Sequence, residues 1–358
     1  MSLPFHDAPD SLCILRLSAV GDICHTLPVV RTIQSHWPST KISWIIGKLE
    51  ASLVQDIPGI DFIIFDKSRG VKAYLDVRKA LQGRRFDALL HMQMSLRSSV
   101  VNRLVNTSVR IGFDRARAKD LQWLFNNAQI PAHHNQHVMD SFFGFAEALG
   151  INDRDLRWDI PIPESDQQQA EKFLPGNEPT LVISPCSSMS YRNWTSDGYA
   201  AVSDYVVKQY GLRVALTGGP SIIELEMGQD IETKCKLPTI NLIGKTNLKQ
   251  LLAILDKATV VLSPDSGPAH MATSVGTPVI GLYACTNPDR ARPYFSGDWV
   301  IDKYHEAVHD KHGKDASQLP WGIRVRDPGT MERITVEDVT HKLDEFMQRR
   351  RSGKAAPQ

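Results

Sequence analysis

Short apolar runs alternate with amphipathic and polar stretches along the whole chain. The runs that we interpret as buried strands cover residues 13–18, 41–46, 62–65, 88–92, 180–184, 213–217, 241–244, 260–262 and 278–283. The stretches that we interpret as helices cover residues 27–36, 71–82, 140–149, 197–210 and 248–258. Strands that alternate with helices indicate βαβ units and parallel sheets, so the pattern predicts an α/β protein.

Pro28 determines where we start the first helix. Because a proline is tolerated only near the first turn of a helix, we expect this helix to run from about Leu27 to His36. Asp22 would then lie in the turn between the first strand and the helix, beside the flexible Gly21. The turn has no G-x-G-x-x-G pattern, which argues against a dinucleotide fold of the dehydrogenase type.

A polar, proline-rich passage separates the two halves of the chain. With 358 residues, the chain is long enough for two domains of ordinary size. We assign residues 1–165 to a first α/β domain, 166–179 to a linker and 180–334 to a second α/β domain. We expect residues 335–350 to form an amphipathic helix that packs back on the first domain, and residues 351–358 to be a disordered tail.

Residues 260–283 predict a strand, a loop, a short helix and a second strand. A proline suits the first position of this helix, and a glycine follows its last position. The loop presents Asp265, Ser266 and Gly267 at a helix N-terminus, where free backbone N–H groups and the helix dipole favour an anion. The alternative is that Asp265 or Ser266 only caps the helix and that His270 packs in the core.

Two other loops of the second half carry groups that suit phosphate oxygens. Ser187, Ser188 and Arg192 can donate hydrogen bonds, and Gly218 and Gly219 let the backbone approach a ligand closely. Since all three loops follow strands of one parallel sheet, they converge on one end of that sheet and predict a ligand that carries a diphosphate. Ligands favour clefts between domains, so we expect the site to face the other domain.

The first half offers an isolated carboxylate, Asp22, at a turn that we expect to face the same cleft. A carboxylate close to a phosphate-stabilised leaving group suits general-base activation of an acceptor hydroxyl. The alternative role of Asp22 is that of a helix cap.

Residues 67–119 are strongly basic in a chain whose charges otherwise balance. This segment contains thirteen Lys or Arg and three Asp, whereas the whole chain has 41 basic and 40 acidic side chains. We expect Arg97, Arg115, Arg117 and Lys119 to attract an acidic acceptor or an anionic membrane surface. The alternative is an ordinary solvated face.

The composition excludes several classes of protein. The balanced charge gives no sign of nucleic-acid binding, and 42% hydrophobic with 23% charged residues are typical of a soluble globular protein. Five scattered cysteines favour a reducing compartment and argue against a disulfide framework or a zinc site. We find no signal peptide and no apolar stretch of the ~20 residues needed to span a bilayer, so we expect a cytoplasmic protein.

Three motifs in order resemble one enzyme family. Residues 15–28 (LRLSAVGDICHTLP), 184–194 (SPCSSMSYRNW) and 263–270 (SPDSGPAH) resemble the lipopolysaccharide heptosyltransferases of glycosyltransferase family 9, over residues 12–346. The chain is most similar to the heptosyltransferase I type, which acts on phosphorylated Kdo. The resemblance implies a GT-B architecture, in which two Rossmann-like domains with parallel sheets face each other across a cleft. It also implies an ADP-heptose donor, inversion at the anomeric carbon, and neither metal nor cofactor.

The resemblance also implies roles for individual residues. Asp22 matches the catalytic base, and Arg192 stands where relatives often have Lys to stabilise the leaving diphosphate. The donor-binding positions are Ser187, Ser188, Arg192, Glu224, Lys245, Thr246, Asp265, Ser266, Gly267 and His270. Glu224 is the expected ribose ligand, with Glu226 as the alternative, and the adenine is expected near Lys245 and Thr246.

Arg16 matches a basic position beside the base in the family. We group it with the basic segment, so the expected acceptor-binding residues are Arg16, Arg97, Arg115, Arg117 and Lys119. The expected acceptor is Kdo-lipid A, reached by peripheral contact with the cytoplasmic face of the inner membrane.

Three alternative functions remain open from the sequence. The chain could add a later heptose, use another nucleotide sugar on the same fold, or bind a sugar nucleotide without catalysis. The intact Asp22 position argues against the last of these. Donor competition between ADP and UDP would separate the second from the main hypothesis.

Overall fold

The computed structural model describes residues 3–353, which divide into two compact units between Pro161 and Ile162. The sequence boundary at 165/166 lies four residues further along the chain. Of the predicted disordered tail, residues 354–358 lie outside the described residues, and Arg351 is the last residue of a helix.

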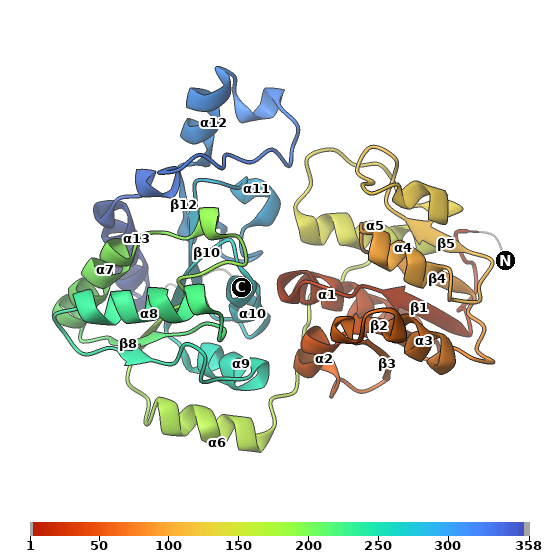
Figure 1. Ribbon diagram of the computed structural model, residues 1–358, viewed down its shortest axis with the longest axis horizontal. Helices are drawn as coiled ribbons and strands as arrows, with labels where there is room; N and C mark the ends of the chain where they lie inside the picture. Colours follow the sequence, from red (N-terminus) through yellow and green to blue (C-terminus); the bar gives the residue numbers. More distant parts are fainter. Residues whose placement is uncertain (1–2, 354–358) are drawn as a thin grey trace. The chain divides into compact units, whose positions relative to one another are not determined.

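The first unit contains one parallel sheet of six strands with helices on both faces (Figure 1). Its strands are β1 (Ser11–Leu15), β2 (Lys41–Gly47), β3 (Ile60–Phe65), β4 (Ala88–His91), β5 (Arg110–Gly112) and β6 (Ala128–Gln129). Its helices are α1 (Val20–His36), α2 (Lys48–Val54), α3 (Val71–Ala80), α4 (Leu96–Asn102) and α5 (Val138–Leu149), with 3₁₀ turns η1 (Lys67–Arg69) and η2 (Gln122–Phe125). The strand order β3-β2-β1-β4-β5-β6 reverses direction between β1 and β4.

The core of this unit follows from the apolar runs of the sequence. Strands β1 and β4 are buried along nearly their whole length, as central strands of a sheet covered on both faces must be. One face packs on α3 and α4 through side chains such as Ala73, Val77 and Val101. Helices α1 and α5 pack against each other, with α1 burying most of its first four turns.

Helix α1 begins seven residues earlier than the sequence predicts, so Pro28 lies inside the helix rather than in its first turn. A proline at position 28 leaves the carbonyl of Cys24, four residues earlier, without its usual N–H donor. The indole Nε1 of Trp158 donates to that carbonyl at 2.7 Å and takes the place of the missing N–H. The hydrogen bond that permits the proline therefore comes from a residue far along the chain. Asp22 consequently sits in the first turn of α1 rather than in a preceding loop.

The second unit repeats the same topology. Its strands are β7 (Thr180–Ile183), β8 (Arg213–Leu216), β9 (Ile240–Asn241), β10 (Val260–Pro264), β11 (Val279–Tyr283) and β12 (Val300–Asp302). Its helices are α6 (Glu164–Phe173), α7 (Ser196–Tyr210), α8 (Ile222–Lys234), α9 (Leu248–Lys257), α10 (Gly267–Ser274), α11 (Pro288–Ala291), α12 (Tyr304–His312) and α13 (Val336–Arg351). Its 3₁₀ turns are η3 (Ser190–Arg192), η4 (Gly297–Trp299), η5 (Ala316–Gln318) and η6 (Met331–Arg333). All pairings are parallel, and the order β12-β11-β10-β7-β8-β9 reverses between β7 and β10, as between β1 and β4.

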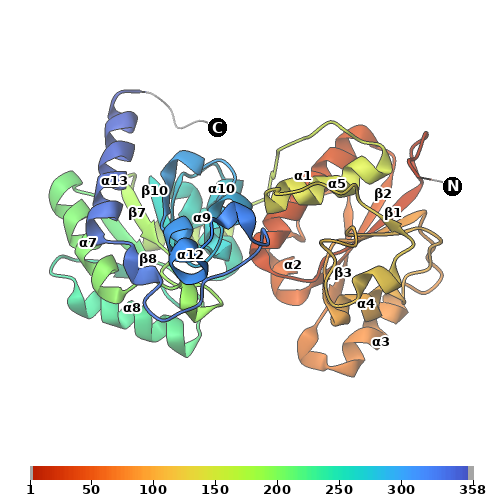
Figure 2. The same ribbon diagram turned by 90° about the horizontal axis from the view of Figure 1, so that it is seen from above.

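Helix α13 packs in the second unit. The prediction from the sequence, that this helix lies on the first domain, was wrong. Its apolar stripe, Val339, Leu343, Phe346 and Met347, is buried in a cluster with α7 and the strands of the second sheet. Figure 2 shows α13 running beside α7. An apolar stripe predicts that a helix face is covered but does not identify the element that covers it.

Helix α6 begins two residues before the expected linker and occupies the first part of it. It packs on α9, where Lys257 pairs with Glu171 and Asn247 donates to Asp166 at 3.2 Å. Its ten residues include one buried side chain, Ala170, so the apolar pattern that reveals a helix is almost absent. Among the described residues no helix is both long and apolar enough to cross a membrane.

We expect Trp158→Phe to lower the free energy of unfolding by about 1–3 kcal/mol, because the Cys24 carbonyl is left buried without a donor. The loss should shrink in a Pro28→Ala background, where residue 28 regains an N–H for that carbonyl. Urea denaturation of the two single variants and the double variant measures this coupling. Strictly additive effects would contradict the proposed relation between Pro28 and Trp158.

Candidate active site

The chemically interesting loops of both units lie where the strand order reverses. In open α/β sheets, loops that leave two neighbouring strands in opposite directions open a crevice at the carboxyl edge, and ligands bind there. In the first unit these are the loops after β1 and β4, and in the second the loops after β7 and β10. The predicted base and the predicted phosphate loops therefore occupy equivalent places in the two units.

Asp22 forms an ion pair with Arg16 at the carboxyl end of β1. One guanidinium nitrogen of Arg16 donates to Oδ2 of Asp22, and the backbone N–H of Ala19 approaches the same oxygen at 3.4 Å. Within the described chain, Oδ1 of Asp22 accepts no hydrogen bond. The Asp22 side chain is 33% exposed, whereas that of Arg16 is 9% exposed. A buried cation thus orients a carboxylate whose second oxygen faces outward.

The end of β4 holds this pair in place. Nη1 of Arg16 donates to the carbonyl of Met92 at 2.5 Å, and its guanidinium lies 5.1 Å from the centre of the Phe142 ring. The neighbouring Gln93 binds the β1–α1 loop at two points. Its Oε1 accepts from the N–H of Leu17 at 2.7 Å, and its Nε2 donates to Oγ of Ser18 at 3.2 Å.

A buried polar network continues from Gln93 below the edge of the sheet. His91 contacts Ser98 Oγ at 3.1 Å and the side chain of Asn126 at 3.2 Å, and Asn102 donates to Asn126 at 2.9 Å. Burial lowers the pKa of His91 to about 4, despite the opposing hydrogen bond with Asn126, so the ring is neutral near pH 7. Gln122 adds bonds to the carbonyls of residues 91 and 93. This network was not predicted from the sequence, because its members are single polar residues in separate elements.

The predicted acceptor-binding residues fall into two groups. Arg117 forms its contacts within the first unit. It pairs with Asp114 and donates to Gln136 at 3.0 Å and to Ser141 at 2.9 Å. This arrangement fixes the segment after β5 and gives Arg117 a structural role. The exposed residues are Arg97, Arg115 and Lys119, with Arg115 stacked at 4.6 Å over Trp123.

In the second unit, the loop after β10 has the predicted form. Asp265 and Ser266 are buried directly before α10, whose first turn contains Pro268. Ser266 makes no side-chain cap for this helix, because its hydroxyl bonds to Ser263 Oγ at 2.8 Å. The helix N-terminus thus keeps its N–H groups for another acceptor, as an anion site requires. His270 is buried within α10.

Arg192 joins the loop after β7 to the loop after β10. It donates to the backbone carbonyl of Asp265 at 3.2 Å and pairs with Oδ2 of the same residue at 3.0 Å. Ser187 is half-buried, and its N–H donates to Asn193 at 2.8 Å, while Ser188 is exposed. Arg192 therefore links two of the predicted phosphate loops, and its charge is balanced by Asp265.

The two candidate ribose ligands differ in position. Glu224 folds back from α8 onto the loop after β8, where it accepts the N–H of Gly219 at 2.6 Å and the hydroxyl of Ser221 at 3.0 Å. A Cβ at Gly218 would lie 2.8 Å from Oε2 of Glu224, so a larger residue there would require this carboxylate to shift. Glu226 is exposed two residues further along the helix. Glu224 as the ribose ligand, with Glu226 as the alternative, remains a prediction.

Lys245 and Thr246, predicted near the adenine, follow β9. Nζ of Lys245 donates to the carbonyl of Asn241 at 2.7 Å, and Thr246 is half-buried just before α9. Lys245 and Thr246 thus lie in the loop between β9 and α9, whereas Glu224 lies in α8, the helix before β9. Their contact with adenine also remains a prediction.

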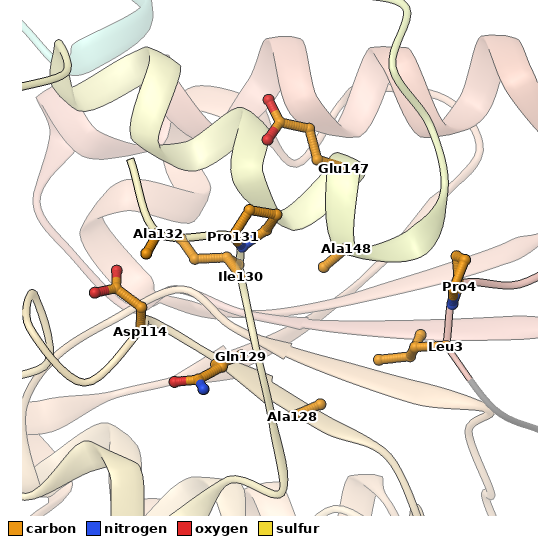
Figure 3. Close-up of a pocket in the computed structure, with 10 residues that line it drawn as sticks. All are labelled: Leu3, Pro4, Asp114, Ala128, Gln129, Ile130, Pro131, Ala132, Glu147 and Ala148. Atoms are coloured by element: carbon orange, nitrogen blue, oxygen red, sulfur yellow. The ribbon is translucent and has the colours of Figure 1, made fainter. Parts of the chain in front are cut away.

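A cavity of about 520 Å³ in the first unit lies among other residues. It is lined by Leu3, Pro4, Asp114, Ala128, Gln129, Ile130, Pro131, Ala132, Glu147 and Ala148 (Figure 3). Its wall is formed by β6, the chain that follows it and the end of α5, and it includes none of the predicted site residues. We attach no catalytic role to it, because it lacks the crevice position and the polar convergence seen at the loops described above.

The cysteines near the candidate site are poorly suited to nucleophilic chemistry. Burial and the charge of Asp22 raise the pKa of the Cys24 thiol to about 12. Burial and the charge of Glu224 raise the pKa of the Cys186 thiol to about 12 as well. Among the described residues, no three His, Cys, Asp or Glu side chains gather as a metal site would need.

Each unit has a Rossmann-like strand order, with a carboxylate at the carboxyl edge of the first sheet and the predicted phosphate loops at that of the second, and this arrangement fits a glycosyltransferase of GT-B architecture. The model of glycosyltransferase family 9 (heptosyltransferase) matches residues 74–320. The lipopolysaccharide core heptosyltransferase OpsX of Haemophilus influenzae is 43% identical over 339 residues, which are 95% of this chain and 97% of that protein. The chain therefore belongs to glycosyltransferase family 9.

Solved structures share the fold over nearly the whole chain. A family 9 glycosyltransferase from Veillonella parvula aligns with a TM-score of 0.77 at 20% identity, covering 95% of this chain and 97% of that one. The Escherichia coli heptosyltransferase WaaC, solved with ADP, aligns with a TM-score of 0.68 at 22% identity, covering 94% and 99%. These likenesses confirm the predicted architecture.

We expect Gln93→Leu to lower the rate of glycosyl transfer by up to about 10²-fold, because the loop that carries Arg16 and Asp22 loses two anchoring bonds. The affinity for the nucleotide should stay within twofold, since the predicted donor ligands lie in the other unit. Gln93→Glu keeps an acceptor for the Leu17 N–H and should retain more activity. Steady-state kinetics with Gln82→Leu, an exposed control, check this expectation. An unchanged kcat in a folded Gln93→Leu enzyme would rule out the positioning role.

Proposed function

We propose that this heptosyltransferase acts in lipopolysaccharide core assembly. It transfers heptose from ADP-L-glycero-D-manno-heptose to the Kdo or phospho-Kdo of the lipid A inner core, with inversion and without a metal. The relative from Haemophilus influenzae carries a lipopolysaccharide core function in its name, and the similar structure from Escherichia coli holds ADP. Both support this assignment.

The observation that carries the catalytic proposal is the state of Asp22. Its Oδ2 is fixed by Arg16 and the Ala19 N–H, while Oδ1 has no partner among the described residues. A general base needs a defined orientation and a free lone pair directed at the proton that it accepts. We propose that Oδ1 takes the proton of the acceptor hydroxyl as that oxygen attacks the anomeric carbon and the bond to the ADP oxygen breaks.

The leaving ADP must gain negative charge as this bond breaks. The N–H groups at the start of α10 and the hydroxyls of Ser187 and Ser188 are the proposed donors to its phosphate oxygens. Arg192 joins the loop after β7, which carries Ser187 and Ser188, to the loop at Asp265 after β10. It therefore positions the proposed donors and also supplies positive charge. Glu224 is the proposed ribose ligand.

Transfer from ADP-heptose to Kdo₂-lipid A and to phosphorylated Kdo-lipid A tests the proposal. We expect product with the wild type in the presence of EDTA, and a rate on the order of 10²–10⁴-fold lower with Asp22→Asn, which keeps the shape but not the basicity of the side chain. The preferred acceptor identifies the transfer step. Absence of product on both acceptors, with ADP still bound, would point to a later heptose or another sugar.

The carboxyl edge of the first sheet has a surface suited to an anionic membrane. Large apolar side chains are exposed after four of its strands: Leu49, Val71, Leu96, Leu121, Trp123 and Leu124. The same segments carry exposed cations, including Lys67, Lys72, Arg97, Arg115 and Lys119. We call this set of side chains the basic rim. Cations that attract acidic headgroups, beside apolar groups that enter the interface, are typical of peripheral membrane contact. A lipid-linked acceptor would then reach the edge that bears Asp22.

We expect the protein to bind vesicles of phosphatidylglycerol and phosphatidylethanolamine, and to dissociate as salt is raised, since salt screens exposed charges. Replacing Arg97, Arg115 and Lys119 by Glu should abolish cosedimentation. The matched control replaces Lys208, Lys314 and Arg350, exposed cations of the second unit, by Glu and should leave binding intact. Salt-independent binding, or equal behaviour of the two triple variants, would argue against the basic rim.

A further inference from the structure

The chain between α12 and α13 brings two arginines to the phosphate loop of the second unit. Arg324 donates to the hydroxyl of Tyr191 at 3.4 Å, and the guanidinium of Arg326 lies 5.5 Å from the centre of the Tyr191 ring. Arg192 lies 5.6 Å from the same ring. Three guanidinium groups thus gather around one aromatic side chain, which follows Ser187 and Ser188 in the same loop.

An alternating pattern places both arginines on one side of this segment. Residues 323–326 read Ile-Arg-Val-Arg, and in extended backbone successive side chains point in opposite directions. Ile323 and Val325 pack into the cluster around Tyr304 of α12, so Arg324 and Arg326 point the other way. The Val325 N–H donates to the Cys285 carbonyl at 3.1 Å, and Arg324 forms a bridge with Thr286, which fixes the segment beside the end of β11.

The backbone of Tyr191 is also held by a hydrogen bond. Its carbonyl accepts from the Cys285 thiol at 3.0 Å, so the serine loop and the arginine segment are both held by Cys285 and its backbone. Burial alone would raise the pKa of Tyr191, but the hydrogen bonds and charges of Arg192 and Arg324 outweigh it and lower that pKa. The tyrosine hydroxyl therefore lies in a positive potential.

The positive charge gathered here lacks a counterion in the protein. Among residues 3–353, neither Arg324 nor Arg326 forms an ion pair. The next residue, Asp327, pairs with Lys311 at 2.7 Å, and the charge of Arg192 is balanced by Asp265. Clustered guanidinium groups repel one another unless an anion lies between them, and their planar donor groups match phosphate oxygens.

We propose that Arg324 and Arg326 bind the diphosphate of the nucleotide sugar and stabilise it as a leaving group, with Tyr191 holding Arg324 in position. This rests on the proposed function, in which a nucleoside diphosphate leaves from the loops around Arg192. The two arginines supply the net positive charge that the Arg192–Asp265 pair does not.

Calorimetric titration with ADP and with adenosine tests the assignment in the full-length enzyme. We expect Arg324→Gln and Arg326→Gln each to raise the Kd for ADP by about 10-fold or more, because each removes a charged donor to phosphate. Adenosine, which lacks phosphates, should bind all variants equally. Arg350→Gln, an exposed cation at the end of α13, is the matched control and should bind ADP like the wild type. Arg324→Lys should fall between Gln and Arg.

Three results would overturn this assignment. The first is equal ADP affinity in the wild type and both Gln variants. The second is an equal loss of adenosine binding, which would indicate a structural defect. The third is unchanged ADP affinity with a raised KM for phosphorylated Kdo-lipid A alone, which would assign the arginines to a phosphate of the acceptor. Failure of the wild type to bind ADP would instead contradict the proposed function, in which ADP-heptose is the donor.

Discussion

Each unit is organised by one constraint, the reversal of strand order in a parallel sheet. The strands on either side of the reversal send their loops apart, and the crevice that opens there has unpaired backbone groups and no regular structure to hold it. In the first unit the loop after β1 is fixed by Met92 and Gln93 of the loop after β4. In the second, the loop after β7 is fixed to the loop after β10 by Arg192. The side chains that cross each crevice therefore decide whether it has a defined shape.

Arginines serve two purposes in this chain, and their partners distinguish them. Arg16, Arg117 and Arg192 each pair with an aspartate of their own unit and fix a loop. Much of their charge is therefore neutralised within the protein. Arg97, Arg324 and Arg326 have no such partner in the described chain. The guanidinium of Arg324 is half-buried and has no counterion among the described residues, and because burying an unpaired charge is costly, this arginine is suited to an anionic ligand. The number of basic residues in a segment thus predicts an anion-binding site less well than the ion-pair partners of each arginine do.

The sequence predicted what depends on neighbouring residues and failed where distant residues decide. Most strands and the strand, loop and short helix around Asp265 follow from local patterns, whereas the position of Arg16 beside Asp22 came from the resemblance to the family. The predicted start of α1 was wrong because Trp158, 134 residues after Cys24, donates to the Cys24 carbonyl in place of the N–H that Pro28 lacks. Helix α13 was assigned to the wrong unit because an apolar stripe does not name its partner. Gln93 and the pair Arg324 and Arg326 were missed because they join the site through tertiary contacts and carry no motif.

The attachment of α1 to residues 155–159 affects the order in which the first unit can fold during synthesis. Besides the bond from Trp158, Arg31 donates to the carbonyls of Trp158 and Asp159, and the Asp155 N–H donates to Thr32. These partners are translated last in the first unit, immediately before the boundary at Pro161. A nascent chain that has released only the strands and helices up to α5 therefore lacks these bonds to α1, which can form only after residues 155–159 have left the ribosome.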